Sequence, residues 1–208
     1  METTIIQQRL FGLPTTAISD AIGGYTNVAS SIKPLSDHFK IAGRALTVRL
    51  PDGENGAVLE AISKAQKGDV IVIDAKGNTN RAVAGDFVMS LAKGVGVQGF
   101  VVEGVIRDLA AVRESNFPVF SLGTTVAAGF KNGGGAVGVP VAIGGVTVHP
   151  GDYIVGDLDG VVIVPNKEVE RIASKAEDKM RKDELRESVA LSGGESSIRA
   201  YLDKVLSK

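Results

Sequence analysis

The stretch Gly99-Phe100-Val101-Val102-Glu103-Gly104 is apolar and bounded by glycines, a pattern typical of a buried strand. An earlier run, Asp69-Val70-Ile71-Val72-Ile73-Asp74, is richer still in the β-branched residues that favour strands. Helical patterns at 55–66 and 85–93 flank that earlier run. Strand and helix therefore alternate through the first 125 residues, which predicts a parallel sheet joined by crossovers.

Shorter segments complete the prediction of an α/β fold. Further strands are expected at 41–50 and 119–122, further helices at 3–11, 17–22 and 109–115, and a loop at 77–80. From Val139 onward, short strands separated by glycine turns predict a compact β meander or small barrel. A long charged helix is expected from Lys167 to about Leu191, and a final helix at 197–206.

Bulk composition favours one ordinary globular domain over residues 1–208, with a C-terminal helical segment at about 167–208. The net charge of −1 without a basic run speaks against nucleic-acid binding. The absence of cysteine excludes disulfides and thiolate chemistry. No apolar run approaches the ~18 residues that a membrane span needs, and the N-terminus lacks the features of a signal peptide. The expectation is a cytoplasmic protein.

The residues best suited to chemistry are Asp86, Arg107 and Asp108. Asp86 opens a predicted helix, whose N-terminal N–H groups attract an anion. Arg107 and Asp108 follow the 99–104 strand, at the end where α/β folds bind ligands. A guanidinium matches a carboxylate or an enolate, and an aspartate oxygen suits Mg²⁺ or Mn²⁺. Together these groups are suited to holding and polarising a small 2-oxo acid.

Each of these residues also has a purely structural interpretation. Asp86 alone fits a helix N-cap, and Arg107-Asp108 alone fits a surface ion pair. The two histidines, His38 and His149, form no metal-ligand pair. Lys76, Lys93 and Lys131 lie in glycine-rich or helix-end settings that indicate solvation, so a Schiff-base lysine is not expected. Gly133-Gly134-Gly135 lacks the ending of a phosphate loop and is interpreted as a flexible turn.

An ordered set of motifs resembles the RraA-like family over roughly residues 13 to 190. The motifs are Gly68-Asp69-Val70-Ile71-Val72-Ile73-Asp74, Gly85-Asp86, Gly104-Val105-Ile106-Arg107-Asp108, Gly144-Gly145-Val146-Thr147-Val148-His149-Pro150-Gly151-Asp152 and Gly156-Asp157-Leu158-Asp159-Gly160-Val161-Val162-Ile163-Val164-Pro165. This family includes 4-hydroxy-4-methyl-2-oxoglutarate aldolases and regulators of ribonuclease E activity. The resemblance implies a swivelling-domain-like α/β/β sandwich that assembles as trimers or hexamers, with sites between subunits.

The resemblance also implies roles for particular residues. The backbone of Gly85, Asp86, Phe87 and Val88 would hold the pyruvate carboxylate, and Arg107 would contact the oxygen that becomes the enolate. Asp108 would hold the divalent metal, Mg²⁺ or Mn²⁺, and Asp86 would orient a metal-bound water.

Two more carboxylates would reach a neighbouring subunit's site. Asp20 matches the first position, where the aldolase pattern has Glu. Glu184 is chosen for the second, with Asp183 and Glu187 as rivals.

The expected function is that of a metal-dependent class II pyruvate aldolase, a carbon–carbon lyase acting on 4-hydroxy-2-oxo acids. Oxaloacetate decarboxylase activity is expected beside it, because loss of CO₂ from oxaloacetate forms the same enolate. The alternative is a non-catalytic regulator that binds and inhibits ribonuclease E. Methyl transfer is disfavoured, since no glycine-rich nucleotide loop follows a strand in the required frame. The expected partners are a small 2-oxo acid and further copies of the chain, without nucleic acid or membrane.

Overall fold

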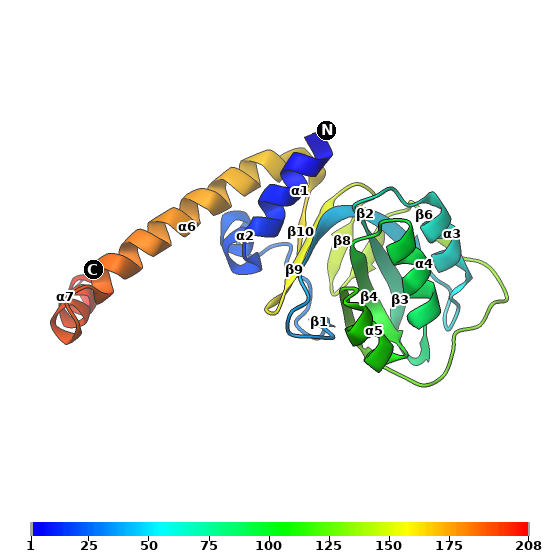
Figure 1. Ribbon diagram of the computed structural model, residues 1–208. Coiled ribbons are helices and arrows are strands. Elements are labelled where there is room, and N and C mark those ends of the chain that lie inside the picture. Colours follow the sequence, from blue (N-terminus) through cyan, green and yellow to red (C-terminus); the bar gives the residue numbers. More distant parts are fainter. Residues whose placement is uncertain (1, 208) are drawn as a thin grey trace.

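The computed structural model describes residues 2–207, with side chains from Ile5, so the two ends of the predicted 1–208 domain lie outside the described residues. A mixed sheet forms the centre of the molecule (Figure 1). Its order is β1 (Lys33–Pro34), β5 (Val119–Thr124), β4 (Gly99–Ile106), β3 (Asp69–Ala82), β2 (Ile41–Arg49), β9 (Tyr153–Asp157) and β10 (Gly160–Val164), with β6 (Ala136–Val137) paired to β2. Strands β2 to β5 are mutually parallel, as predicted.

The central sheet lies between two layers (Figure 1). Helices α4 (Asp86–Gly94) and α5 (Leu109–Ser115) cover one face, beside α3 (Gly56–Lys64). A hairpin of β7 (Val141–Ile143) and β8 (Val146–Val148) lies behind the strands. This layering confirms the predicted α/β/β sandwich.

A second hydrophobic cluster joins the N- and C-terminal helices to the sheet. Helices α1 (Glu2–Gly12), α2 (Thr15–Ile22) and α6 (Val169–Leu191) pack against β9 and β10. Successive side chains of β9 point to opposite faces of the sheet, so this strand contributes to both hydrophobic clusters. Tyr153 and Val155 belong to the second cluster, and Ile154 belongs to the main core. A short 3₁₀ turn, η1 (Asn166–Glu168), precedes α6.

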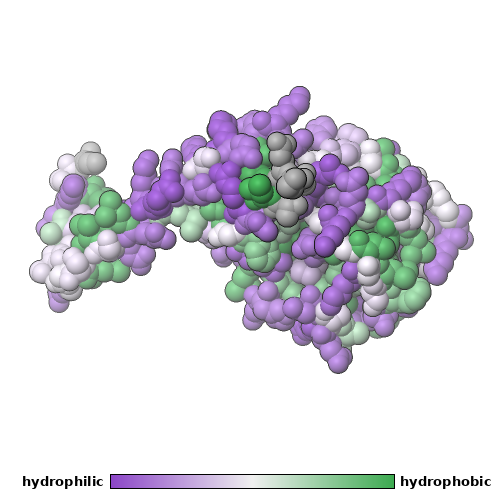
Figure 2. Space-filling model, turned by 45° about the horizontal axis from the view of Figure 1, so that its top comes forward, coloured by the Kyte–Doolittle hydropathy of each residue, from purple (hydrophilic) through white to green (hydrophobic). Residues whose placement is uncertain are grey.

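Helix α6 extends away from the sheet and carries α7 (Glu195–Leu206) at its far end (Figure 1). Figure 2 shows hydrophobic surface at this end of the molecule. It includes exposed apolar side chains of both helices, namely Leu185, Val189, Ile198, Leu202 and Val205. An apolar surface of this kind is typical of a protein–protein contact.

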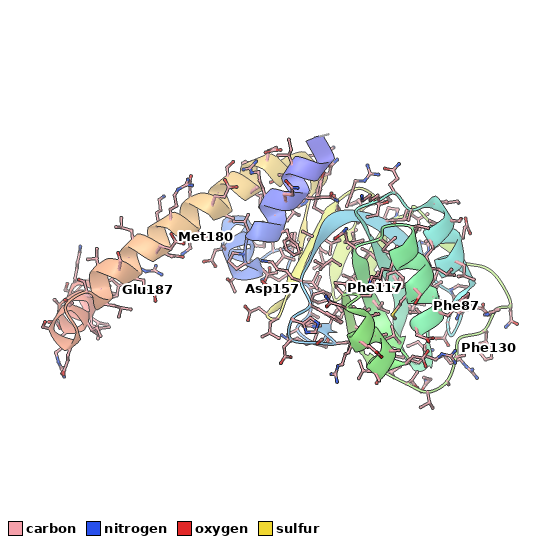
Figure 3. All side chains as sticks on the ribbon, viewed as in Figure 1. Phe87, Phe117, Phe130, Asp157, Met180 and Glu187 are labelled. Carbon is pink, nitrogen blue, oxygen red and sulfur yellow. The ribbon has the colours of Figure 1, made fainter. Side chains whose placement is uncertain are left out.

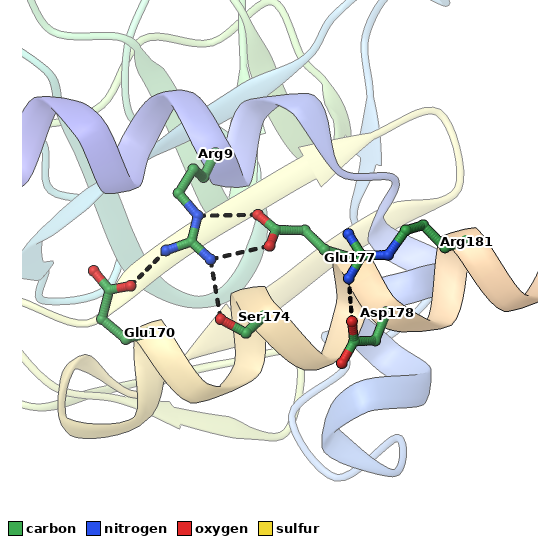
Figure 4. A network of polar contacts seen from close by, with 6 residues as sticks. All are labelled: Arg9, Glu170, Ser174, Glu177, Asp178 and Arg181. Atoms are coloured by element: carbon green, nitrogen blue, oxygen red, sulfur yellow. Dashed lines mark hydrogen bonds and ion pairs between the residues drawn. The ribbon is translucent and has the colours of Figure 1, made fainter.

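Arg9 fastens α1 to α6 (Figure 4). Its guanidinium donates to both carboxylate oxygens of Glu177, at 2.9 and 3.1 Å, to Glu170 at 2.5 Å and to Ser174 at 3.1 Å. The hydrogen bonds from Arg9 lower the pKa of Glu177. The same partners, Glu177 first, raise the pKa of Arg9. The pair therefore remains ionised, and it orients α6 on the sheet.

Two predicted local features differ from the structure. The 77–80 stretch, expected as a loop, continues β3 with shifts in its register to β4. Asn78 explains the irregularity, because its side-chain oxygen accepts the N–H groups of Asn80 and Arg81. The short strands after Val139 form where expected but divide between two sheets, since β9 and β10 join the central sheet. No helix among residues 2–207 has both the length and the apolar character needed to cross a membrane.

Candidate functional site

The end of β4 and the start of α4 meet at one pocket. Arg107 follows β4 directly, and its N–H donates to the carbonyl of Ala84 at 3.1 Å, just before α4 begins. This hydrogen bond brings the residues before α4 to the carboxyl end of the parallel strands, where α/β sheets bind ligands. The pocket has a cavity volume of about 130 Å³, and its lining includes Gly85, Asp86, Phe87, Val88 and Arg107.

Asp108 joins the parts of this site through one oxygen. Its Oδ2 atom accepts the backbone N–H of Asp86 at 3.2 Å and lies 3.4 Å from Nε of Arg107. Asp108 adopts left-handed backbone angles, with φ of 62° and ψ of 40°. Such angles are uncommon outside glycine and cluster at functional sites. The Asp108 side chain is 37% exposed and that of Arg107 is 44% exposed, so both are open to a ligand.

Gly85 is required by the closeness of these side chains. A Cβ atom added at this position would lie 2.3 Å from Oδ2 of Asp108 and 3.0 Å from Nε of Arg107. Its backbone is extended, so the requirement concerns space and not backbone angles. The buried glycine therefore allows the carboxylate and the guanidinium to lie against the start of α4.

The first turn of α4 supplies hydrogen-bond donors to the pocket. The N–H of Phe87 is bonded to the carboxylate of Asp86 at 2.7 Å. The N–H of Val88 has no hydrogen-bond partner within residues 2–207. A free donor at a helix N-terminus, with a guanidinium beside it, favours a bound carboxylate.

The opposite wall contains functional candidates that the sequence analysis missed. Asn55 and Lys131 line the pocket together with Ala82 and Ala128. The Oδ1 atom of Asn55 is the one buried side-chain polar atom in the described part of the chain without a hydrogen-bond partner. An orphaned buried oxygen is costly, and this one belongs to a residue that lines the pocket. Asn55 precedes a helix and fits a simple cap by sequence, which concealed its place at the pocket.

Asp20 and Glu184 lie in a different place from the pocket. They line a groove between α2 and α6 with Asp183 and Glu187, and this groove shares no lining residue with the 85–107 pocket. In Figure 3, Met180 and Glu187 on α6 lie far from Phe87 and Phe130. Within one chain, the two predicted sets of carboxylates are therefore not brought together.

Lys179 organises the carboxylates of this groove. Its ammonium lies 2.9 Å from Asp183 and 3.4 Å from Asp20. Hydrogen bonding to Asp183 first, and also to Asp20, raises the pKa of Lys179. The same bond lowers the pKa of Asp183. No such pairing involves Glu184 in the described residues, so its carboxylate remains free to act elsewhere.

Comparison with known proteins identifies the family. A model of the RraA-like proteins, described as Aldolase/RraA, matches residues 15–163. The chain belongs to the RraA-like family. The matched region includes Asp20, Asp86, Arg107 and Asp108, whereas α6 and α7 lie beyond it.

Some relatives of this RraA-like chain are named as aldolases, and others as inhibitors of RNA processing or members of an RNase inhibitor family. A protein of Halalkalibacterium halodurans, provisionally named a 4-hydroxy-4-methyl-2-oxoglutarate aldolase, is 51% identical over 93% of this chain and 92% of its own. The solved structure of the RNase ES inhibitor family member RraAS2 of Streptomyces coelicolor is similar with a TM-score of 0.80, at 29% identity over 88% of this chain and 96% of that one. The RNA-processing inhibitor RraA of Thermus thermophilis has a TM-score of 0.68 and 30% identity, over 73% of this chain and 92% of its own.

The described part of this RraA-like chain has no enclosed metal site. Within residues 2–207 there is no cluster of three or more His, Cys, Asp or Glu side chains that would enclose an ion. Asp108 instead offers an exposed carboxylate, with Asp86 next to it. One or two carboxylates together with substrate and water is the usual arrangement for Mg²⁺, and it suits an ion shared with a substrate.

Proposed function

We propose that this protein is a divalent-metal-dependent pyruvate aldolase. It would cleave 4-hydroxy-4-methyl-2-oxoglutarate or related 4-hydroxy-2-oxo acids, and would also decarboxylate oxaloacetate. The observation that carries the proposal is the meeting of Arg107 and the free N–H of Val88 at one pocket, with the Asp108 carboxylate 3.4 Å from Nε of Arg107 just beside it. The name of the relative from Halalkalibacterium halodurans supports the same reaction class.

The proposed roles follow from the charge that develops in the reaction. When the C3–C4 bond breaks, its electron pair moves toward the C2 oxygen, and the C4 hydroxyl loses its proton to become a carbonyl. The Arg107 guanidinium would bind the C2 oxygen and stabilise its negative charge. The free N–H of Val88, in the first turn of α4, would hold the adjacent carboxylate. Asp86, exposed at the pocket, would orient the water that takes the hydroxyl proton.

Asp108 would hold the divalent cation, Mg²⁺ or Mn²⁺. When bound, this cation would supply a Lewis acid for the C2 oxygen. The single exposed carboxylate supports this role, because Mg²⁺ retains water and needs few protein ligands.

The far wall of the pocket favours a substrate with a second polar end. Lys131 is the cationic residue of that wall, and the Asn55 oxygen beside it lacks a donor. A substrate with a distal carboxylate would suit this wall, because the carboxylate would pair with the Lys131 ammonium. This complementarity supports 4-hydroxy-2-oxo diacids as the preferred class.

We further propose that complete sites form between subunits of a homotrimer or homohexamer. Asp20 and Glu184 line a groove that shares no residue with the pocket of their own chain, so their carboxylates would serve a site only on a neighbour. The apolar surface of α6 and α7 supports self-association (Figure 2).

A second candidate function is inhibition of an RNA-degrading enzyme without catalysis. The likeness to the RNA-processing inhibitor of Thermus thermophilis supports it. A binding protein of this kind has no need of Asp86, Arg107 and Asp108 at one pocket. Adding the purified chain to a ribonuclease E assay would test it, since the aldolase proposal expects no inhibition.

The direct test of the proposed function is a panel of 4-hydroxy-2-oxo acids and oxaloacetate, with pyruvate release measured with and without EDTA. We expect release that depends on Mg²⁺ or Mn²⁺ and is abolished by EDTA. Failure to release pyruvate from every member of the panel, with metal present, would overturn the proposal.

A further inference from the structure

The segment at 127–132 crosses the structure beside the pocket and is fastened at both ends. At one end, Ala82 donates to the carbonyl of Ala127 at 2.8 Å and accepts from Gly129 at 3.0 Å. At the other end, Phe130 donates to Gly53 at 2.8 Å and accepts from Asn55 at 3.1 Å. These backbone bonds place Ala128 and Lys131 along the wall that faces α4.

Glu54 is a buried acid that fastens the segment on the far side of Lys131. Glu54 is only 6% exposed. Both of its carboxylate oxygens accept the backbone N–H of Asn132, at 3.1 and 3.3 Å. No Lys or Arg forms an ion pair with it in the described residues. Burying a carboxylate with so few partners is costly, and the contact that this one makes is with the residue next to Lys131.

Arg81 fastens the segment on the near side of Lys131. Its guanidinium lies 3.7 Å from the ring centroid of Phe130 and donates to the carbonyl of Ala128 at 2.9 Å. The planar cation therefore stacks on one residue of the segment and hydrogen-bonds another. Lys131 thus lies between Phe130 and Asn132, which are held separately by Arg81 and by Glu54.

The contacts made by Arg81 and Glu54 matter because a flexible glycine run follows Asn132. Without them, the backbone of Lys131 would be held less firmly. Gly133, Gly134 and Gly135 all have positive φ values, and this run has the backbone freedom of glycine. A lysine side chain has much rotamer entropy to lose on binding. Fixing its backbone in advance lowers the free-energy cost of pairing its ammonium with a ligand.

We propose that Glu54 and Arg81 are positioning residues that hold Lys131 where it binds the distal carboxylate of the substrate, and so set the preference for diacids. The inference rests on the proposed function of the pocket. Glu54 acts through the Asn132 N–H and does not touch the substrate itself.

The test compares two reactions that differ in their need for a distal carboxylate. Cleavage of 4-hydroxy-4-methyl-2-oxoglutarate uses a diacid whose distal carboxylate is retained, whereas exchange of pyruvate methyl protons with D₂O needs no distal carboxylate. For Glu54→Ala and for Lys131→Met, we expect KM for 4-hydroxy-4-methyl-2-oxoglutarate to rise about tenfold, the loss of one charge-assisted contact. In Glu54→Ala, kcat and pyruvate exchange should change little, because Glu54 does not touch the substrate. Glu54→Gln should remain near wild type, because its amide oxygen still accepts the Asn132 N–H.

The double variant Glu54→Ala/Lys131→Met decides whether the two residues act as a unit. Its KM should equal that of Lys131→Met alone, since Glu54 has no effect without the lysine. Additive effects, or an equal loss of pyruvate exchange in Glu54→Ala, would overturn the inference. If Glu54→Ala does not fold, Arg81→Met replaces it in the same cycle with the same expectations. Wild-type protein inactive in both reactions would instead refute the proposed function.

A matched control is available on the neighbouring helix. Glu60 is an exposed glutamate of α3 whose one ion pair within the described residues is with Lys64, at 2.5 Å. Glu60→Ala should leave KM for 4-hydroxy-4-methyl-2-oxoglutarate unchanged. A rise in KM equal to that of Glu54→Ala would show that the effect is not specific to the buried acid, and would count against the inference.

Discussion

Oδ2 of Asp108 accepts the backbone N–H of Asp86 at 3.2 Å, which joins the carboxyl end of β4 to the amino end of α4. The same oxygen lies 3.4 Å from Nε of Arg107. One carboxylate oxygen thus joins a helix terminus and a guanidinium at a pocket open to solvent. The predictions below test whether this arrangement is catalytic.

Arg107→Lys keeps the positive charge but removes the planar fork. We expect kcat to fall about a hundredfold or more, because oxyanion donors of fixed geometry contribute on that scale. Thermal unfolding should change little, since the Arg107 side chain is 44% exposed and the variant keeps its positive charge. Arg113→Lys is the control, because Arg113 lies on α5 and bonds the carbonyl of Leu35. Equal activity of Arg107→Lys and wild type would contradict the assigned role.

Gly85→Ala places a Cβ atom where Asp108 and Arg107 now lie. The added methyl should push both side chains aside and reduce kcat/KM at least tenfold, because small displacements at a reacting centre have large effects. Gly94→Ala, at the other end of α4 with open space around it, should leave activity unchanged. The comparison requires steady-state kinetics of both variants. Unchanged kinetics in Gly85→Ala would mean that the crowding is not important for catalysis.

Mixing inactive variants tests whether sites are shared between subunits. Asp108→Asn and Asp20→Asn should each be inactive as pure oligomers. After the two are co-denatured and refolded in equal amounts, about a quarter of the sites should combine two intact halves and regain activity. Activity is measured as pyruvate release. Full activity of Asp20→Asn alone, or no recovery in the mixture, would oppose a site between subunits.

Glu184→Gln, tested against Asp183→Asn, identifies which carboxylate of α6 takes part.

The Arg9–Glu177 pair predicts a particular loss of stability in acid. Since its hydrogen bonds lower the pKa of Glu177 in the folded state, the pair contributes stability above the unfolded pKa of about 4.3. That contribution disappears as the pH falls through the folded value. Glu177→Gln should therefore reduce the free energy of unfolding by about 1 kcal/mol at pH 7, with the difference from wild type vanishing in strong acid.

Urea unfolding from pH 7 to pH 3 measures this difference. Glu195→Gln is the control, because Glu195 forms an exposed pair with Arg199 on α7 and should have little effect. A difference between Glu177→Gln and wild type that stays constant across the range would exclude the ion pair as its cause.

The elements that position the site could be predicted from sequence because their signals are local. The apolar runs at 69–74 and 99–104 indicated β3 and β4, so Arg107 and Asp108 were correctly placed after a buried strand. Asp86 was likewise correctly placed at the start of a helix. These are periodic patterns in which each residue reports its own environment.

The far wall of the pocket could not be predicted because it depends on contacts between distant segments. Asn55 resembles an ordinary residue before a helix, and Lys131 resembles a solvated lysine among glycines. Only backbone pairing of 127–130 with Gly53, Asn55 and Ala82 brings them to the pocket. A contact at the start of α2 was hidden in the same way, since the carboxylate of Asp157 accepts the N–H and the hydroxyl of Thr15, which is distant in sequence.

The most direct test of the central claim is the exchange of pyruvate methyl protons in D₂O, followed by NMR for wild type and Asp108→Asn. Asparagine tolerates the left-handed backbone of this position, so the variant should fold normally. The account predicts exchange by wild type with Mg²⁺ or Mn²⁺, its loss with EDTA, and its loss in Asp108→Asn at every metal concentration. Exchange at the wild-type rate in Asp108→Asn would contradict it.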